Sequence, residues 1–352
     1  MTAHRIALVP GDGIGQEVVP AAVRVIDHLA AQAGLDLTYE HFDLGADRYL
    51  RDGTTMPADV MARWNSGEFG AVMMGALGDP RVPSNIHARD ILLGARFELD
   101  LFINLRPVRL LDPRYTPLKD KGPDDIDMVV FRENTEGLYT GIGGQFKKDT
   151  PDEVAIEAEL NTRKGVERII RAAFEYADRH GRPSVCMSDK SNAMRHGHDL
   201  WQRVFKAVAA EYPAIEALHL YVDVLCMELV RKPERFDVIV TNNLFGDIVT
   251  DLGAQLQGGI GLAASGNLHP GKVGLFEPVH GSAPDIAGKD LANPLAAILS
   301  AGMMLTYLGH PELEQRIQKA VQDVLASGAV TRELGGSLGT AAATDAVIEV
   351  LG

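Results

Sequence analysis

Short runs of apolar, often β-branched residues alternate along the chain with longer segments whose apolar residues recur at helical spacing. This alternation predicts an α/β architecture in which buried strands are separated by helices. The apolar run from Ile6 to Val9 lies in the first expected strand. The full set of expected strands is Arg5–Val9, Leu37–Phe42, Ala71–Met74, Met128–Phe131, Ser184–Met187 and Asp237–Thr241.

Two helices are marked by both their starts and their apolar spacing. Thr162 can cap a helix in which Val166, Ile169, Ala173 and Phe174 share one face. A second helix is expected at Asn293-Pro294, where a capping residue precedes a proline in the first turn. Its continuation, LAAILSAGMML, is apolar nearly all round and predicts a buried helix. Residues 141–160 are glycine-rich and then charged, which indicates an exposed loop or an arm that reaches a partner subunit.

Length and composition limit the class of protein. A chain of 352 residues, 46% of them hydrophobic, is large enough for two domains or lobes. Its apolar runs are too short for a membrane span, and its first residues lack a secretory pattern, so we expect a cytoplasmic protein with no membrane partner. Cys186 and Cys226, both in strand-like stretches, suit buried thiols in a reducing compartment. The formal charge of −14 argues against a nucleic-acid partner.

A glycine-rich turn, GDGIG at residues 11–15, follows the first strand and opens a helix. Such a turn is one mark of a dinucleotide site, although its spacing departs from G-x-G-x-x-G. The alternative is a tight connection that needs glycine backbone angles.

Two aspartates, Asp247 and Asp251, follow the expected strand FDVIVT. If a helix starts near Phe245, their spacing of four residues puts both carboxylates on one face, within reach of one ion. Mg²⁺ and Mn²⁺ prefer such oxygen ligands. Alternatively, the two acids stabilise the helix N-terminus against its dipole.

Three arginines and one lysine lie in or beside apolar segments. Arg106 and Arg132 are at strand ends and Arg96 follows HARDILLGA, so three converging guanidiniums would suit a dicarboxylate. Lys190, in CMSDKSN, would act as a base if neighbouring cations lowered its pKa. The alternative is that all four are ordinary surface or ion-paired side chains. Similarly, the Gly- and Pro-rich segment from Glu277 onward suits either a nucleotide loop or an ordinary long loop.

Taken together, these segments resemble the β-decarboxylating dehydrogenases, the family of 3-isopropylmalate, isocitrate, homoisocitrate and tartrate/D-malate dehydrogenases. The resemblance runs almost from end to end. It rests on GDGIG (11–15), INLRPV (103–108), RENTEGLY (132–139), DKSN (189–192), FDVIVTNNLFGDIVTDL (236–252), EPVHGSAPDIAGKDLANP (277–294) and ELGGSLGT (333–340).

The resemblance implies a two-lobed α/β fold that is not the standard Rossmann fold. Residues 1–101 with 258–352 would form the cofactor-binding lobe, and residues 102–257 the substrate, metal and dimerisation lobe. It also implies a homodimer with shared active sites, clasped by an arm near residues 141–160.

Site residues follow from the same resemblance. Arg96, Arg106 and Arg132 would bind the carboxylates of a small-molecule dicarboxylate substrate. Asp247 and Asp251 of one subunit, with Asp223 of the other, would hold Mg²⁺ or Mn²⁺. Tyr139 and the partner subunit's Lys190 would be the acid–base pair. The expected NAD-binding residues are Ile14, His280, Gly281, Ser282, Ala283, Pro284, Asp285, Ile286 and Asn293.

The implied reaction is metal- and NAD-dependent oxidation of a 2-hydroxy dicarboxylic acid, followed by loss of CO₂. Asp285 favours NAD because a carboxylate accepts hydrogen bonds from ribose hydroxyls and repels a 2′-phosphate. Leu92 and Leu93 favour an apolar substituent such as the isopropyl group of 3-isopropylmalate, the leading substrate, as in leucine biosynthesis. Tartrate or D-malate remains an alternative because the chain has RENTEG where isopropylmalate enzymes usually have RELTGG, and homoisocitrate is a further one. A catalytically silent regulatory subunit is the non-enzymatic alternative.

Overall fold

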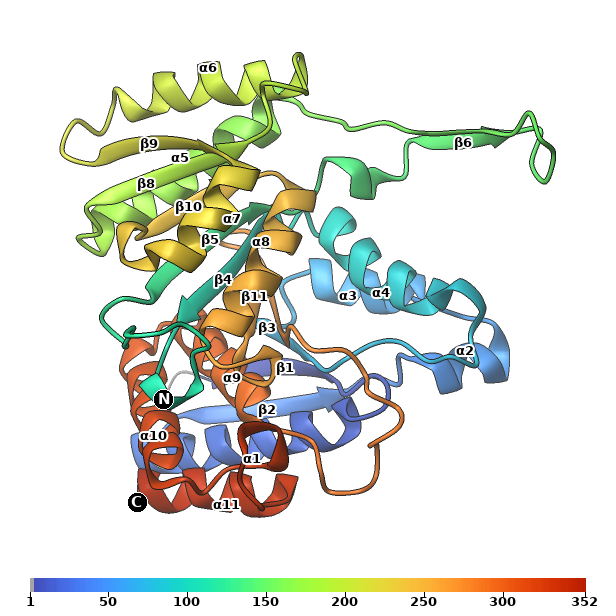
Figure 1. The fold of residues 1–352 in the computed structure, drawn as a ribbon. Coiled ribbons are helices and arrows are strands. Elements are labelled where there is room, and N and C mark those ends of the chain that lie inside the picture. Colours follow the sequence, from blue (N-terminus) through green and yellow to red (C-terminus); the bar gives the residue numbers. More distant parts are fainter. Residues whose placement is uncertain (1–2) are drawn as a thin grey trace. The chain divides into compact units, whose positions relative to one another are not determined.

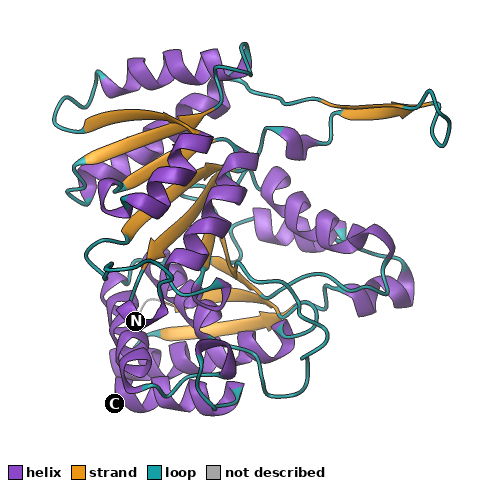
Figure 2. Cartoon of the chain, in the orientation of Figure 1, coloured by secondary structure: helices purple, strands orange, loops and turns teal. Residues whose placement is uncertain are grey.

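A computed structural model describes residues 3–352, which divide into two compact units (Figure 1). Unit 1 contains both chain ends and comprises the residues up to Leu101, residues 109–123 and the residues from Ala254 onward. Unit 2 comprises residues 102–108 and 124–253. Each unit combines helices with a mostly parallel set of strands, so the predicted α/β class is confirmed (Figure 2).

The strands of unit 1 lie in the order β2–β1–β3–β12–β11. Four of them are parallel to their neighbours, and β11 runs antiparallel to β12. They are β1 (Ala3–Val9), β2 (Asp36–His41), β3 (Ala71–Met74), β11 (Ala264–Leu268) and β12 (Gly274–Pro278). The sequence predicts the first three of these strands to within one or two residues at each end, and it misses β11 and β12.

Both faces of β3 are buried, which explains why all four of its residues, AVMM, are apolar. Val72 and Met74 of β3 pack in one cluster with Trp64 and Ile91. Met73, between them, points to the opposite face because side chains alternate along a strand. The first face is covered by α3 (Ala58–Asn65) and α4 (Ile86–Glu98), and the other helices of unit 1 are α1 (Gly15–Ala33), α2 (Ala46–Asp52), α9 (Leu295–Tyr307), α10 (Pro311–Ser327) and α11 (Thr340–Leu351).

The apolar helix predicted after Asn293 is confirmed as α9, which is buried over nearly its whole length. It packs against α1, α10, β11 and β12, so its apolar character is used inside unit 1. Among residues 3–352, no helix combines the length and apolar character needed to cross a membrane.

Unit 2 has the strand order β4–β5–β10–β8–β9, and its last four strands are parallel to one another. Thr162 caps α5 as predicted, with its hydroxyl accepting a hydrogen bond from the Gly165 amide at 3.0 Å. The elements are β4 (Ile103–Arg109), β5 (Asp127–Glu133), β8 (Ser184–Asp189), β9 (Glu216–Tyr221), β10 (Val238–Thr241), α5 (Arg163–Arg179), α6 (Gly197–Ala209), α7 (Val222–Arg231) and α8 (Asn243–Leu256).

Cys226 corrects one sequence-based expectation. Cys186 is buried in β8 as predicted, but Cys226 lies in the helix α7 and is only partly buried. Apolar residues in VDVLCMELV recur closely enough to suggest a strand, yet the buried positions are Leu225 and Leu229, four residues apart, which is helical spacing. Both thiols are free.

The glycine-rich segment of unit 2 forms an antiparallel hairpin of β6 (Gly143–Phe146) and β7 (Val154–Glu157). In Figure 1 this hairpin projects from the other elements of its unit. Phe146 and Ile156 are 66% and 61% exposed, which is unusual for large apolar residues and typical of a surface that a partner covers.

Gly15, the first residue of α1, provides a test of how closely this helix start packs against the loop after β1. A Cβ at Gly15 would lie 2.1 Å from the carbonyl oxygen of Pro10, so Gly15→Ala forces a backbone shift. We expect this variant to lose about 1–3 kcal/mol of unfolding free energy, the usual cost of overpacking, measured by urea denaturation.

Gly94→Ala is the matched control, because a Cβ there meets no atom within 4 Å and the residue is inside α4. It should be neutral or stabilising by up to about 1 kcal/mol, since alanine favours a helix over glycine. Equal losses in the two variants would contradict the steric explanation.

Candidate active site

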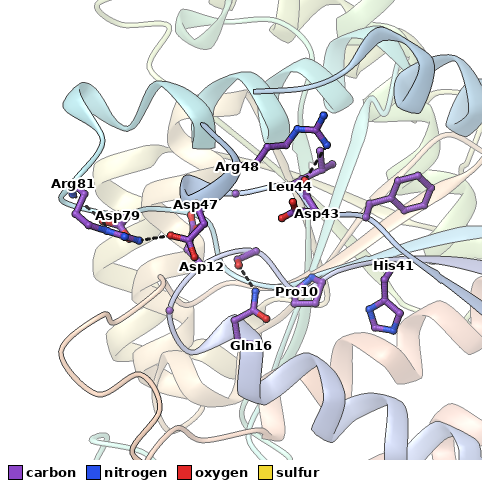
Figure 3. A pocket seen from close by; sticks show the side chains of 14 residues that line it. Pro10, Asp12, Gln16, His41, Asp43, Leu44, Asp47, Arg48, Asp79 and Arg81 are labelled. Carbon is purple, nitrogen blue, oxygen red and sulfur yellow. Dashed lines mark hydrogen bonds and ion pairs between the residues drawn. The ribbon is translucent and has the colours of Figure 1, made fainter. Parts of the chain in front are cut away.

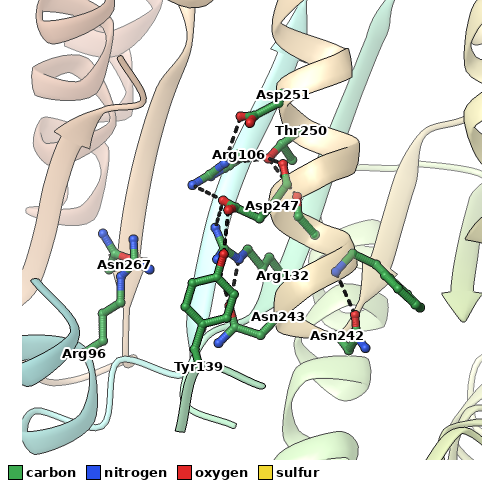
Figure 4. A network of polar contacts seen from close by, with 12 residues as sticks. Arg96, Arg106, Arg132, Tyr139, Asn242, Asn243, Asp247, Thr250, Asp251 and Asn267 are labelled. Atoms are coloured by element: carbon green, nitrogen blue, oxygen red, sulfur yellow. Dashed lines mark hydrogen bonds and ion pairs between the residues drawn. The ribbon is translucent and has the colours of Figure 1, made fainter. Parts of the chain in front are cut away.

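The aspartate pair lies at the start of α8 in unit 2. The helix begins at Asn243, two residues before the expected position, because the Asn242 side chain accepts a hydrogen bond from the Phe245 amide at 2.9 Å. Asp247 and Asp251 are therefore one turn apart on the same face, as predicted (Figure 4).

Arg132, in β5, reaches this helix from a buried position. It is 1% exposed and donates from Nε and a terminal nitrogen to Asn243 Oδ1 at 3.0 and 2.8 Å. Its other terminal nitrogen donates to Asp247 Oδ1. A Cβ at Gly246 would lie 2.4 Å from Arg132 Cγ, so this glycine lets the arginine stem lie directly against the helix.

Arg106 and Tyr139 complete the group around Asp247. Arg106, in β4, donates to Thr250 Oγ1 at 2.6 Å and lies 3.4 Å from Asp247 Oδ1 and 4.0 Å from Asp251 Oδ1. The Tyr139 hydroxyl donates to Asp247 Oδ2 at 2.7 Å, and the Arg132 guanidinium lies 5.2 Å from the centre of its ring. Unit 2 therefore brings together two predicted arginines, the tyrosine and both aspartates.

The charges of this group suit a divalent cation. Burial, followed by the negative charge of Asp247, raises the pKa of Asp251 above its usual range. A cation between the two carboxylates would relieve that repulsion, and hard ions bind carboxylate oxygens. Within residues 3–352, however, no three acidic, histidine or cysteine side chains gather as a metal site. Asp247 and Asp251 thus fit two ligands of an ion that needs a third protein ligand or water.

Lys190 and Asp223 form a separate pair in unit 2. Lys190 follows β8, and its Nζ donates to Asp223 Oδ1 in the first turn of α7. This hydrogen bond lowers the pKa of the Asp223 carboxyl. The structure therefore brings these two predicted residues together but does not group Asp223 with Asp247 and Asp251.

Arg96, the third predicted arginine, belongs to α4 in unit 1. It is buried and donates to Glu277 Oε1 at 3.1 Å, and the Asn267 side chain donates to the same oxygen at 3.0 Å. Among the described residues its buried Nε has no hydrogen-bond partner, as expected for an arginine that binds a further anion. Leu92 and Leu93, also in α4, are both half-buried, and Leu92 packs against the core of unit 1.

The glycine-rich turn at residues 11–15 is packed against the predicted cofactor loop. The Ile14 amide donates to the Ser282 carbonyl at 2.8 Å, and a Cβ at Gly13 would lie 2.0 Å from that oxygen. The turn therefore needs glycine for the close approach of another loop. The Ile14 amide already donates to Ser282 and is not free to bind a phosphate, which supports the interpretation of this turn as a tight connection.

Two side chains of the predicted cofactor loop have unused polar atoms. His280 Nε2 and Asn293 Nδ2 are buried, and neither has a hydrogen-bond partner in the part of the chain that the structure describes. Burial lowers the pKa of His280, which favours a neutral imidazole. Asp285 is exposed and lies one position after Pro284 in this loop. These groups fit an uncharged ligand with hydrogen-bonding edges, such as the adenosine of NAD.

A cavity of about 550 Å³ in unit 1 lies beside the loops that follow β1 and β2 (Figure 3). In a Rossmann fold this edge of the sheet holds the dinucleotide. None of the predicted site residues lines the cavity, and its Arg81 already pairs with Asp47 and Asp79 at 2.7 and 2.6 Å. We therefore do not assign the active site to this cavity.

Sequence reasoning missed the residues that hold the arginines. Asn243 fixes Arg132, Thr250 fixes Arg106, and Glu277 fixes Arg96. Each lies within a motif that the sequence analysis singles out, so their positions were identified from the sequence. Their roles were not, because each contact joins residues at least 111 positions apart in the chain.

Comparisons with known proteins agree with this architecture. A 3-isopropylmalate dehydrogenase of Thermobifida fusca is 47% identical over 91% of both chains, and one of Frankia casuarinae is 47% identical over 96% of this chain and 99% of its own. The crystal structure of an isocitrate dehydrogenase from Methylococcus capsulatus superposes with a TM-score of 0.89 at 38% identity and covers 99% of both chains. A model of the isocitrate/isopropylmalate dehydrogenase family matches residues 5–351. The chain therefore belongs to the isocitrate/isopropylmalate dehydrogenase family.

Proposed function

We propose that the chain catalyses the NAD-dependent oxidative decarboxylation of 3-isopropylmalate, with Mg²⁺ or Mn²⁺ bound. The observation that carries the proposal is the grouping of Arg106, Arg132 and Tyr139 around the Asp247 carboxylate. This group offers anion-binding cations, a phenolic proton and acidic metal ligands within one unit. The names of the 3-isopropylmalate dehydrogenases cited above support the choice of substrate.

Arg106 and Arg132 act first by binding substrate carboxylate. Both guanidiniums are buried, and a carboxylate gains more from such a partner than from an exposed one. Thr250 and Asn243 already hold their orientation, so little side-chain entropy is lost when the anion binds. Arg96, held by Glu277, is the third carboxylate ligand in this proposal.

The cofactor and the metal have residues that fit them. Asp247 and Asp251 hold the cation, and the partner subunit's Asp223 supplies the third carboxylate. The loop from His280 to Ile286, with Ile14 and Asn293, holds the adenosine end of NAD. When bound, NAD⁺ supplies the hydride acceptor and the divalent cation supplies positive charge beside the substrate oxygens.

Proton transfer is the task of two side chains. The partner subunit's Lys190 removes the proton of the substrate hydroxyl, through a water or a carboxylate, as the hydride leaves C2. The 2-keto acid then loses CO₂ and leaves an enolate. Tyr139 donates its phenolic proton to the enolate carbon, and its hydrogen bond to Asp247 holds the hydroxyl in a defined direction before the substrate arrives.

Two observations support shared sites in a homodimer. Lys190 and Asp223 contact each other and are not grouped with Asp247 in the described residues of this chain. The hairpin β6–β7 exposes Phe146 and Ile156, and Ile142 just before β6 is exposed as well, which suits a partner contact. We therefore propose that each of two copies contributes Lys190 and Asp223 to the active site of the other, and that the hairpins form part of the contact between the subunits.

The metal is tested by Asp247→Asn, which keeps the shape of the side chain and removes its charge. We expect kcat to fall by at least about 100-fold, since losing a charged ligand weakens divalent-metal binding. The melting temperature should fall as well, because the buried Arg106 and Arg132 lose a carboxylate partner. Mn²⁺ titration calorimetry after chelator treatment should show weaker binding. Asp178→Asn, at an exposed position of α5, is the control. Wild-type turnover and Mn²⁺ affinity in Asp247→Asn would show that the metal assignment is wrong.

Cofactor choice is tested by comparing NAD⁺ with NADP⁺. Wild type should prefer NAD⁺ by at least about tenfold in kcat/KM, because seating a 2′-phosphate beside Asp285 costs about 1.4 kcal/mol or more. Asp285→Ser should reduce this ratio, whereas Asp345→Ser, at an exposed position of α11, should leave it unchanged. Equal use of both cofactors by wild type rules out the proposed role of Asp285.

Substrate choice is tested at Leu93, since Leu92 also packs against the core of unit 1. Burying an isopropyl group gains roughly 2 kcal/mol, so wild type should favour 3-isopropylmalate over D-malate by about thirtyfold or more in kcat/KM. Leu93→Ala should erode that preference and affect D-malate turnover less, because malate has no substituent to fill the space.

The exposed Leu50→Ala in α2 is the control for general effects of truncating a leucine. A parallel fall for both substrates in Leu93→Ala would indicate a packing role instead. A wild-type preference for D-malate or tartrate would overturn the choice of substrate, while leaving the reaction class intact.

A further inference from the structure

A fully buried histidine lies behind the lysine that the proposed mechanism uses as a base. His198, in α6, is 0% exposed, and its Nδ1 accepts a hydrogen bond from the Lys190 amide at 2.7 Å. Lys190 is the first residue after β8, where the chain leaves the strand and turns. The histidine therefore fixes the main chain at the point from which the lysine side chain starts.

This contact sets the protonation of the imidazole ring. Because Nδ1 accepts the Lys190 N–H, the ring proton must be on Nε2. Nε2 faces both oxygens of Glu159 at 3.4 Å, so the Nε2–H tautomer satisfies the carboxylate as well. Burial raises the pKa of Glu159, but the hydrogen bond from His198 and other donors outweigh it and leave this pKa lowered. Glu159 is thus a charged acceptor, and the Asn242 side chain also donates to it at 2.6 Å.

Glu159 connects this network to the base of the hairpin. It lies two residues beyond the end of β7, and the next residue, Leu160, bridges to Gly137, whose amide donates to the Leu160 carbonyl at 2.8 Å. Helix α6 holds this strand end a second time, because Trp201 Nε1 donates to Asn161 Oδ1 at 2.8 Å. The base of the hairpin and the Lys190 turn are therefore fixed to one helix.

The other proton-transfer residue starts from the same place. Tyr139 lies two residues after Gly137, which makes the bridge to Leu160. The bridge between Gly137 and Leu160 therefore helps to position Tyr139. The same hairpin base is connected to Lys190 through the contacts of Glu159 with His198 and of His198 with the Lys190 amide. A partner subunit that binds the hairpin would therefore affect the positions of both Tyr139 and Lys190.

Other contacts of the Lys190 turn do not replace the histidine. Asp189, the preceding residue, is buried and held by His219 at 2.9 Å and by Gln202 at 2.9 Å. These groups anchor the strand end, whereas the Lys190 amide is given to His198. The edge-on contact of His198 with the Phe245 ring, 5.6 Å between centres, would also suit a leucine and so does not explain a polar residue here.

We propose that His198 is a positioning residue for Lys190 and that, with Glu159, it couples the hairpin base to the lysine. The proposal rests on the role of Lys190 in the proposed function. His198 touches neither substrate nor cofactor in this scheme. Its effect is on the turnover of bound substrate and not on substrate affinity.

The test compares three substitutions that keep different parts of the histidine. His198→Asn puts an amide oxygen near the place of Nδ1 and can still accept from the Lys190 amide. His198→Gln puts its amide toward Glu159 without that acceptor, and His198→Leu removes both contacts. Glu159→Gln keeps an oxygen for the imidazole and removes the charge. His180→Leu, an exposed histidine at the end of α5, is the matched control.

We expect His198→Leu and His198→Gln to lower kcat by about tenfold or more, with KM for acid and cofactor within about twofold, because the loss falls on the transition state. His198→Asn should retain at least about a third of wild-type kcat, as it keeps the hydrogen bond that positions the lysine. Glu159→Gln should lie between these values. Full kcat in His198→Leu, or equal losses in His198→Asn and His198→Leu, would overturn the proposal.

Two measurements do not depend on turnover. The ¹⁵N shifts of His198 in the wild-type protein should show a protonated Nε2 and an unprotonated Nδ1, and a protonated Nδ1 would overturn the proposal even if no variant folds. Hydrogen exchange at the Lys190 amide should accelerate in His198→Leu and stay slow in His198→Asn. If wild type oxidises none of the acids, the proposed function fails, while these two measurements still decide whether His198 holds Lys190.

Discussion

The candidate site depends on one constraint, which is that two buried guanidiniums share a single carboxylate. Arg106 and Arg132 leave different strands, yet both end at Asp247 on α8. A buried cation without a partner is strongly destabilising, and Asp247 is a carboxylate partner of both arginines. The same carboxylate also accepts the Tyr139 hydroxyl. Because one group satisfies three others, a substrate anion or a metal ion that binds here must redistribute these contacts and cannot simply add to them.

Glycine makes these close contacts possible at two separate places. Gly246 has no side chain where the Arg132 stem crosses α8, and Gly13 has none where Ser282 approaches the turn after β1. In both cases a methyl group would lie within 2.4 Å of a neighbouring atom, so the surrounding structure would have to shift. The turn at residues 11–15 therefore resembles a dinucleotide fingerprint for a steric reason. Its glycines admit a neighbouring loop, and that loop carries buried polar atoms of His280 and Asn293 that still lack partners within residues 3–352.

The sequence predicts those parts of the structure that depend on local pattern. The central strands β1, β3, β5, β8 and β10 each contain a continuous apolar run, the Thr162 cap is a local hydrogen bond, and Asp247 and Asp251 share a face through helical spacing alone. Strands β11 and β12 contain Gly, Asn, Ser or Pro and give a weak signal, and Cys226 shows that a short apolar run can be helix. The contacts of Asn243, Thr250 and Glu277 with arginines were beyond prediction from one sequence, because they join distant segments whose approach only the fold determines.

The net charge and the proposed anionic substrate are compatible because the relevant field is local. A formal charge of −14 is spread over the surface, where salt screens it within about 8 Å at physiological ionic strength. Arg96, Arg106 and Arg132 are each less than a tenth exposed, so salt screens them much less. Each is also held by an acid of its own unit, Glu277 for Arg96 and Asp247 for the other two, which keeps the empty protein stable. In the proposed function, an incoming carboxylate would compete with Asp247 for Arg106 and Arg132, and a divalent cation on Asp247 and Asp251 would lower that competition by drawing the aspartate charge toward itself. Metal and substrate are therefore expected to bind cooperatively, which follows from the shared carboxylate.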